Sequence, residues 1–377
     1  MAIRGKIKER RAVLAPRARF NGAPDAIQLF YIGREFYPVL AEQLGAAQTE
    51  ILLNTYSFDF DSVGQQVVAI LRARAAAGVR VRLIFDALES SERGAPVLRA
   101  LTDSGVEVRA YRPLGYAWRR PASFLYRDHA RLFLIDRKIL GLGGMSIGEI
   151  YNDRIDLFGF MPVSQPAPLL NFFEQLWQAS LKPAVSQLTA EPAQIFPGRR
   201  ILISGPAPAE QQIYAWWLKT VRAARREVVI VTSFFFPTRE MAGELIAARR
   251  RGARVVIVTP GATDKNRYDN FRSIPIAPLL TQGILWYATP FYFHAKFILV
   301  DQAWSFGSSN CDIISLKRNY ELDVTGRGGE TLAGLKAGLA RLTAGQTPRR
   351  TQPKTWFFGW FSHILYWLFE FFFTANG

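Results

Sequence analysis

Apolar and polar positions follow two patterns along residues 28–345, and together the patterns predict an α/β fold. Short apolar runs, as in residues 51–56 and 227–232, are typical of buried strands. Residues 34–47 and 238–251 instead carry apolar side chains at helical spacing, which indicates helices with one buried face. Strands and helices that alternate in this way favour strand–helix–strand units with parallel pairing.

The predicted elements form two series that run in the same order. The first comprises a helix over 34–47, a strand over 51–56, a helix over 63–77 capped by Ser62, a strand over 79–85, a helix over 97–104 and a strand over 105–111. The second comprises a helix over 210–224, a strand over 227–232, a helix over 238–251, a strand over 254–258 and the segment 279–287. Arg-Ala-Ala-Ala-Gly78-Val-Arg-Val in the first series resembles Arg-Arg-Arg-Gly252-Ala-Arg-Val in the second, so the chain carries an internal duplication.

The duplication divides the chain into two expected domains. We expect halves over 21–182 and 200–345, joined by a linker over 183–199 where prolines cluster. A basic arm over 1–20 precedes the first half, and a segment over 346–377, basic and then aromatic, follows the second. At 377 residues the chain is long enough for two hydrophobic cores.

A polar motif interrupts an apolar run near the end of the second series. His294, Lys296 and Asp301 have the spacing H-x-K-x4-D, and a glycine-containing turn that ends at Asn310 follows them. Because residues i and i+2 of a strand face the same side, His294 and Lys296 should point the same way.

The same motif recurs at the matching place in the first series. His129, Arg131 and Asp136 repeat the spacing, and a glycine-rich turn that ends at Ser146 follows. The chain has only three histidines, and two of them lie in these motifs. One such histidine could be an ordinary buried residue of a strand, but two in duplicated contexts indicate a shared function.

Two histidines and two cations in one pocket would suit a phosphodiester. One neutral imidazole can attack phosphorus while the other, protonated, donates to the departing oxygen. Lys296 and Arg131 can hold the non-bridging oxygens as negative charge shifts in the transition state. This chemistry needs no metal ion or other cofactor, and we expect none.

The chain is strongly basic, which indicates a polyanionic partner. Its formal net charge is +16 and its sequence pI is about 10.2. Nucleic acid and an anionic membrane surface both fit this charge. A single cysteine, Cys311, excludes an internal disulfide and a zinc site built from cysteines.

Two aromatic segments favour the membrane over nucleic acid. An insertion within 112–127 contains Trp118, Arg119 and Arg120, a mixture that suits a membrane interface, although the loop could instead cover the core. The C-terminal segment carries Trp356, Trp360 and Trp367 after basic residues, which favours an anchor in the plane of an anionic membrane. A spanning or re-entrant tail and an oligomer-packing helix remain alternatives.

The paired motifs resemble the phospholipase D superfamily, whose hallmark is a duplicated H-x-K-x4-D. The resemblance covers nearly all of residues 28–345. It implies two tandem α-β-α sandwich halves related by a pseudo-twofold axis, with the active site at their interface. It also implies a phosphohistidine intermediate, with His129 and His294 as nucleophile and general acid in an order that stays open.

The resemblance extends to further site residues. It places the motif aspartates Asp136 and Asp301 among the catalytic residues, Asn310 and Ser146 as phosphate contacts, and Glu321 and Asp156 as acids that orient a histidine. We prefer Asp156 to Asp153 because His129 and Asp156 are 27 residues apart, as are His294 and Glu321. Arg131 departs from the usual lysine and Ser146 from the usual asparagine, so the first half-site is either reshaped or weakened.

One stretch is most similar to the bacterial cardiolipin synthase branch. Gly143-Gly-Met-Ser-Ile-Gly-Glu-Ile-Tyr151 resembles the Gly-Gly-(Met/Ile/Leu)-Asn-Ile-Gly-x-x-Tyr of those enzymes. The resemblance implies a phosphatidyltransferase that acts on phospholipids such as phosphatidylglycerol, without nucleic acid as a partner. We expect it at the cytoplasmic face of the bacterial inner membrane, peripheral or monotopic, like the shorter forms without an N-terminal transmembrane pair.

Other functions remain open from the sequence. A phospholipase D hydrolase or a phosphatidylserine synthase-like enzyme would use the same site. A phosphodiesterase acting on nucleic acid would fit the charge, and a catalytically weak lipid-binding scaffold would fit the altered first half.

Overall fold

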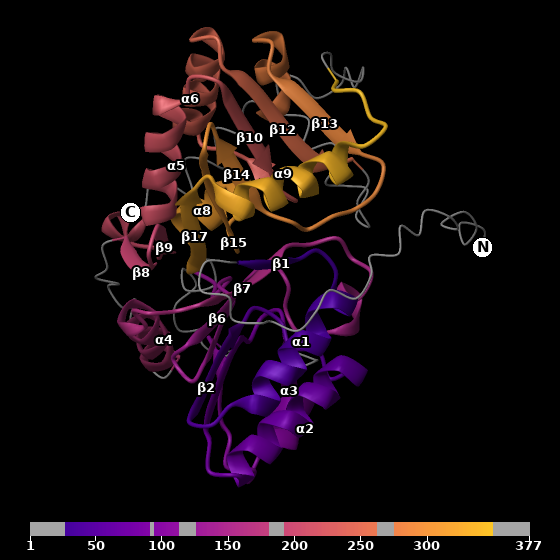
Figure 1. Cartoon of the computed structure of the whole chain (residues 1–377), viewed down its shortest axis with the longest axis vertical. Helices are drawn as coiled ribbons and strands as arrows, with labels where there is room; N and C mark the ends of the chain where they lie inside the picture. The colour runs from indigo at the N-terminus through magenta and orange to yellow at the C-terminus, as the bar shows by residue number, and fades with distance from the viewer. Residues whose placement is uncertain (1–26, 91–93, 113–125, 181–191, 262–274, 350–377) are drawn as a thin grey trace, which may run out of the picture.

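Two mixed β-sheets, each with helices on both faces, form the protein (Figure 1). The structure is a computed structural model, and it describes residues 27–90, 94–112, 126–180, 192–261 and 275–349. The first half lies below the second in the view of Figure 1, and β6 of the first sheet contacts β15 and β17 of the second. The predicted fold, with two tandem α/β halves, is therefore confirmed.

The elements of the first half follow the predicted order closely. They are β1 (Gln28–Phe30), α1 (Gly33–Ala46), β2 (Glu50–Thr55), α2 (Ser62–Ala76), β3 (Arg80–Asp86), α3 (Gly94–Leu101), β4 (Glu107–Tyr111), β5 (Leu132–Ile135), β6 (Ile139–Gly143), η3 (Glu149–Tyr151), β7 (Phe158–Pro162) and α4 (Ala167–Ala179).

The second half repeats this series with small additions. Its elements are β8 (Ala193–Phe196), β9 (Arg199–Ser204), η4 (Pro208–Glu210), α5 (Gln212–Ala223), β10 (Glu227–Val231), β11 (Phe235–Phe236), α6 (Arg239–Arg250), β12 (Arg254–Pro260), β13 (Leu285–Thr289), β14 (Phe297–Val300), β15 (Ala303–Gly307), β16 (Cys311–Asp312), α8 (Ile313–Lys317), β17 (Glu321–Arg327) and α9 (Gly329–Thr343).

Strand order shows the duplication in three dimensions. The first sheet runs β4-β3-β2-β5-β6-β7-β1, and the second runs β13-β12-β10-β14-β15-β17-β9, with β8 added at its edge. In each sheet the first three of these strands are parallel and the others antiparallel. Each position in one sheet therefore has a counterpart in the other.

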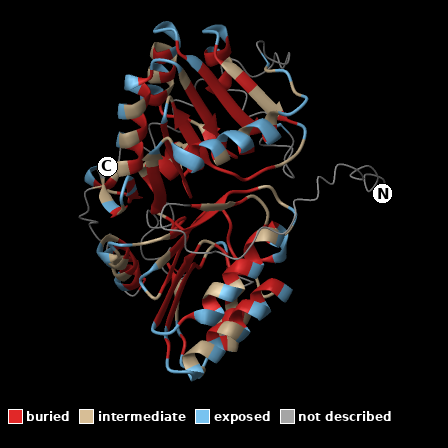
Figure 2. Ribbon diagram, viewed as in Figure 1, coloured by how far each residue is buried: buried red, intermediate tan, exposed pale blue. Residues whose placement is uncertain are grey.

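Three hydrophobic clusters hold the layers together (Figure 2). One lies between the first sheet and α1–α3, and a second between the second sheet and α5–α6. The third contains apolar residues from both halves, including Leu132, Leu142, Phe297 and Leu322. Because this cluster is shared, separating the halves would expose apolar surface from each.

Backbone hydrogen bonds cross between the halves beside both motif histidines. The amide of His129 donates to the carbonyl of Tyr320 at 3.0 Å. The amide of Tyr320 in turn donates to the carbonyl of Arg127 at 2.9 Å. The amide of His294 donates to the carbonyl of Ile155 at 2.7 Å. The two histidine segments are thus bonded to the opposite half.

These bonds correct the expectation that each histidine lies within a strand. β5 begins at Leu132 and β14 at Phe297, one residue after the basic residue of each motif. The segments before them bond to the opposite half and so leave the ladder of their own sheet. Successive side chains nevertheless still point to opposite sides, since Ala130 and Ala295, the middle residues of the two motifs, are fully buried in the shared cluster.

Two local predictions were also wrong. The N-cap of α2 is Asp61, whose carboxylate accepts from the amide of Gly64 at 3.0 Å, whereas the Ser62 hydroxyl donates to Glu149. Asp61 caps the helix because it lies one residue before the first helical residue, and from this position a side chain can accept from the free amides of the first turn. The predicted linker over 183–199 contains β8, which pairs with β9 in the second sheet.

Several expectations fall on residues that the structure does not describe. These are the basic arm over 1–20, Trp118, Arg119, Arg120, Trp356, Trp360 and Trp367. Among the described residues, every helix is too short or too polar to cross a membrane.

The motif aspartates Asp136 and Asp301 do not reach the histidines, which corrects their assignment as catalytic residues. Each follows the four-residue strand that its histidine precedes, so they lie at the opposite end of that strand. Both adopt positive φ angles, of 49° and 53°, in the turn after the strand.

Each of these carboxylates instead binds three consecutive backbone amides. Asp136 accepts from the amides of residues 48–50 at 2.7 to 3.1 Å, and Asp301 from those of residues 225–227 at 2.9 to 3.0 Å. Partial burial alone would raise the pKa of Asp136, but the amide donors outweigh it and lower that pKa. The aspartates therefore fix the turn to the start of a central strand.

Replacing Asp136 should cost stability and leave the chemistry intact. We expect Asp136→Ala to lower the free energy of unfolding at pH 7 by about 2 kcal/mol, because charge-assisted bonds to three amides are lost. Since folding lowers this pKa, the difference from wild type should shrink as the pH falls below about 4. Urea unfolding measures it, with Glu89→Ala as the control for removing an exposed carboxylate. A large loss of activity in the folded variant would contradict this prediction and indicate that Asp136 acts in catalysis.

Candidate active site

Both motif histidines lie at the interface of the two halves, where little of each side chain is exposed. About a tenth of each imidazole side chain is accessible, 10% for His129 and 11% for His294. The carboxyl groups that bind them, Glu321 and Asp156, are completely buried. A ligand can therefore reach the imidazoles but not the acids behind them.

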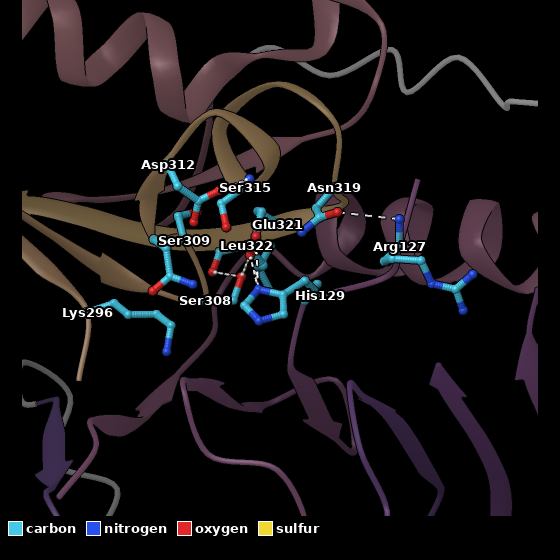
Figure 3. Close-up of polar contacts among 12 residues, drawn as sticks. Arg127, His129, Lys296, Ser308, Ser309, Asp312, Ser315, Asn319, Glu321 and Leu322 are labelled. Atoms are coloured by element: carbon cyan, nitrogen blue, oxygen red, sulfur yellow. Dashed lines mark hydrogen bonds and ion pairs between the residues drawn. The ribbon is translucent and has the colours of Figure 1, made fainter. Parts of the chain in front are cut away.

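Each histidine is bound by an acid from the opposite half. Nδ1 of His129 lies 2.9 and 3.0 Å from the two carboxylate oxygens of Glu321, on β17 (Figure 3). Nδ1 of His294 lies 2.8 Å from Oδ2 of Asp156, in the segment before β7. Such bonds leave Nε2 of each ring as the nitrogen that faces a substrate.

The spacing argument identified both acids but not their crossed pairing. Asp156 is the buried acid of the first half, whereas Asp153 forms a surface ion pair with Arg34 at 2.7 Å. His129 and Asp156 are 27 residues apart in the first half, yet each bonds to a residue of the second half and not to the other. Sequence spacing places residues within a repeat and carries no signal for contacts between repeats.

Glycine is required in the turns that follow both motifs, where a buried acid, Asp156 or Asp323, packs against the turn. A Cβ atom on Gly144 would lie 2.1 Å from Oδ1 of Asp156, and one on Gly307 would lie 2.3 Å from Oδ1 of Asp323. Any side chain there would displace the acid. The glycines that follow both motifs therefore let the next strand bring its carboxyl group close.

Lys296 lies directly against the ring of His294. Its Nζ atom is 3.0 Å from Nδ1 and 3.1 Å from Nε2, and it donates to the His294 carbonyl at 2.6 Å. Burial is the main cause that lowers the pKa of Lys296, to about 7. A buried ammonium with few partners is suited to a phosphate oxygen.

Arg131, the counterpart of Lys296, is fixed by its own half. Its Nη1 donates to the carbonyl of His129 at 2.5 Å and its Nε to the hydroxyl of Ser146 at 3.2 Å. Its guanidinium carbon lies 5.1 Å from the ring centroid of Tyr56. The two departures from the family pattern, Arg131 and Ser146, are thus in contact with each other.

The polar residues after the two turns are both tied to the loop that follows a central strand. The Ser146 hydroxyl accepts from the amide of Ser57 at 3.4 Å. Oδ1 of Asn310 accepts from the hydroxyls of Thr232 and Ser233 at 3.3 and 3.0 Å. This orientation turns the Asn310 NH₂ group away from those hydroxyls, whereas the Ser146 oxygen is already used by Arg131.

Two tyrosines beside the histidines were not predicted as site residues. Tyr56 meets His129 edge-on with ring centroids 4.7 Å apart, and Tyr292 stacks on His294 at 6.4 Å. Tyr56 ends a predicted strand, and Tyr292 lies two residues before its histidine. An aromatic residue with a polar hydroxyl at such a position could have indicated a site residue from the sequence.

The two histidine–acid pairs differ electrostatically. Burial and then nearby cations lower the pKa of both histidines, that of His294 to about 3. Burial raises the pKa of Glu321 to about 8. For Asp156 burial acts in the same direction, but His294 and Lys296 together outweigh it and lower the pKa. Asp156 is therefore ionised at neutral pH, whereas Glu321 retains a proton more readily.

Within the described residues, no three histidine, cysteine or acidic side chains are grouped so that they could hold a metal ion. The basic residues of the two motifs are Lys296 and Arg131. Both are almost completely buried, at 1% exposure each.

A family model for "Cardiolipin synthase, PLD-like domain" matches residues 40–151 and 218–342. The two matched stretches contain both histidine motifs and together span more than half of the chain. Each stretch covers most of one of the two halves.

Named relatives show the same likeness. Cardiolipin synthase 1 of Bacillus anthracis is 26% identical over 329 residues, which cover 81% of this chain and 64% of that protein. Cardiolipin synthase B of Escherichia coli is 27% identical over 318 residues, which cover 79% of this chain and 75% of that protein. The chain thus spans less than two thirds of the length of the Bacillus protein.

A solved structure shares the fold. Phosphatidylserine synthase of Haemophilus influenzae superposes with a TM-score of 0.72, and the match covers 92% of each chain at 12% identity. With the family model matched over most of both halves, the chain belongs to the cardiolipin synthase family of phospholipase D-like proteins.

Proposed function

We propose that this protein is a phosphatidyltransferase, which moves a phosphatidyl group from one phospholipid to a hydroxyl group of a second lipid. The observation that carries the proposal is the pair of histidines at one interface, each bound at Nδ1 by a buried acid from the opposite half. Such a site offers two Nε2 atoms, one to attack and one to donate a proton.

The first step would form a phosphohistidine. One imidazole nitrogen attacks phosphorus, the bond from phosphorus to the headgroup oxygen breaks, and the second imidazole gives its proton to that oxygen. Lys296 and Arg131 stabilise the charge on the non-bridging oxygens, and their burial strengthens this interaction.

The second step would transfer the group to its acceptor. The second imidazole, now neutral, takes the proton of the acceptor hydroxyl while that oxygen attacks phosphorus. The bond between phosphorus and nitrogen breaks, and the first imidazole recovers its lone pair.

Three observations support a lipid substrate. Relatives are named cardiolipin synthases. Among the described residues, the large apolar side chains that are exposed are Ile150 at 50%, in η3, and Phe234 at 38%, in the segment before β11. An exposed apolar side chain on each of these segments suits contact with a bilayer. The charge of +16 suits an anionic surface, and we expect the enzyme at the bacterial membrane.

Phosphatidylglycerol vesicles test the proposal. Wild-type protein should produce cardiolipin or a related transfer product, detected by mass spectrometry, and His294→Ala should produce none. Phosphatidic acid alone would instead indicate a hydrolase. Cleavage of a DNA or RNA oligonucleotide with no lipid product, or vesicle binding that is unaffected by loss of either histidine and has no turnover, would contradict the proposal.

Arg131 and Ser146 should behave as a coupled pair. Arg131→Lys removes the bond to Ser146 and leaves space beside it, so we expect kcat/KM to fall at least about tenfold. Arg131→Lys with Ser146→Asn restores the lysine–asparagine combination of the second half and should recover most of the loss. A double-mutant cycle measures the coupling, and strictly additive losses would show that the two residues act independently.

Activity should fall as the pH rises through about 7. Lys296 has a pKa lowered to about 7, so above that pH it loses the charge that holds phosphate. In free enzyme this appears as a decline in kcat/KM that approaches about tenfold per pH unit. Lys296→Arg, which stays charged, should move the decline to higher pH. A decline that is unchanged in this variant would exclude Lys296 as its source.

A further inference from the structure

A third cation, Arg154, lies beside the second motif histidine without belonging to either motif. Its guanidinium carbon is 5.1 Å from the ring centroid of Tyr292 and 5.5 Å from that of Tyr151. Tyr292 in turn stacks on His294, with ring centroids 6.4 Å apart. Arg154 is partly exposed, whereas the two motif cations are almost completely buried. One aromatic ring thus contacts both an accessible guanidinium and the imidazole.

The register of the backbone places Arg154 on the same side as His294. Ile155 forms an isolated parallel bridge with Phe293, and the amide of His294 donates to the carbonyl of Ile155 at 2.7 Å. The side chains of Ile155 and Phe293 pack in the hydrophobic cluster shared by the halves. Because consecutive side chains of an extended segment point to opposite sides, Arg154 and Asp156 face away from that cluster, toward the histidine.

Arg154 adds a positive charge beside a site that already has two cations. Burial is the main cause that lowers the pKa of Lys296, to about 7, and the charge of Arg154 lowers it as well. The guanidinium is therefore close enough to act on the motif ammonium. A phosphodiester carries a single negative charge, which Lys296 and Arg131 can match together. A third cation exceeds what one phosphodiester needs and suits a second anionic group.

No acidic side chain of the described residues forms an ion pair with Arg154. The neighbouring carboxylate, Asp153, is bound instead by Arg34, at 2.7 and 2.9 Å. A guanidinium has five N–H donors in a planar fork that matches two oxygens of a phosphate. Within this part of the chain, the donors of Arg154 are therefore available to an external anion.

The opposite histidine has a cation at the matching place, but a buried carboxylate already binds it. In the parallel bridge on that side, Asn319 takes the place of Arg154. Arg127 takes the place of Tyr292, and its amide donates to Oδ1 of Asn319 at 3.4 Å (Figure 3). The guanidinium of Arg127 binds the completely buried Asp86 at 2.5 and 3.1 Å. Of the two places, only that of Arg154 therefore offers a cation to a ligand.

We propose that Arg154 binds the phosphodiester of the acceptor lipid, while the two motif cations hold the phosphoryl group that is transferred. The inference rests on the proposed phosphatidyl transfer and assigns a residue to the choice of acceptor. In phosphatidylglycerol three carbons join the terminal hydroxyl to the phosphate, so a cation beside the histidines can hold that phosphate while the hydroxyl approaches phosphorus. Water and neutral alcohols carry no such group, so Arg154 selects against them. It takes no part in the bond changes, which remain those of the two steps above.

Two soluble acceptors that differ by a phosphodiester test this assignment. The donor is a short-chain phosphatidyl-p-nitrophenol, whose release of p-nitrophenol follows the first step, and the acceptors are glycerol and glycerophosphoglycerol. Wild-type enzyme should have the lower KM for glycerophosphoglycerol. Arg154→Ala should raise that KM at least about tenfold, because a charge-assisted contact to phosphate is lost. The KM for glycerol and the release of p-nitrophenol should stay unchanged.

Three further variants make the result specific. Arg154→Gln keeps the stem of the side chain on Tyr292 and should behave as Arg154→Ala does. Arg154→Lys keeps the charge and should retain part of the preference for glycerophosphoglycerol. Arg254→Ala is the matched control, because it removes a half-exposed arginine that pairs with Glu227 at the start of β12, and it should change neither KM.

Each other outcome has a distinct meaning. Equal changes for both acceptors in Arg154→Ala would show that the residue only supports Tyr292 and His294, and would overturn the assignment. An unchanged preference together with weaker binding to phosphatidylglycerol vesicles would place Arg154 against a phosphate of the bilayer, and would overturn it too. No transfer product from wild type with either acceptor would instead count against the proposed transferase itself.

Discussion

A buried acid from the opposite half binds Nδ1 of each motif histidine, and the rest of the site depends on this crossed pairing. Glu321 binds Nδ1 of His129 and Asp156 binds Nδ1 of His294, and each acid thereby orients its imidazole. Backbone bonds from both histidine segments to the opposite half and a hydrophobic cluster shared by the sheets hold the two pairs in register. Neither half contains a complete site, so the chemistry needs both.

The sequence predicted the architecture well because each repeat is specified locally. Apolar periodicity located the strands and helices, and the repeated spacing of 27 residues identified both acids. Sequence reasoning failed where the deciding contact joins the two repeats, or where it is made by the residue next to the one predicted. The crossed pairing is of the first kind, and the cap of α2, which is Asp61, is of the second. Asp136 was misplaced because a motif shows that residues occur together, not that their side chains converge.

The altered first half is compensated within itself. An arginine is longer than a lysine and has a planar group of donors, so it needs a smaller partner, and Ser146 supplies a hydroxyl within reach. Tyr56 covers the face of the guanidinium and the edge of His129, which places one aromatic ring against both. The second half keeps its lysine free to lie against His294. The two halves therefore share a topology and differ in how their cations are held.

The configuration at phosphorus gives the most direct test of transfer through a histidine at this composite site. A phospholipid made chiral at phosphorus with sulfur and an oxygen isotope would be converted by the enzyme, and the configuration of the product would be determined by ³¹P NMR. Two successive displacements, the first by an imidazole and the second by the acceptor hydroxyl, predict retention of configuration. Inversion would mean that the acceptor attacks phosphorus directly, and it would contradict a covalent role for either histidine.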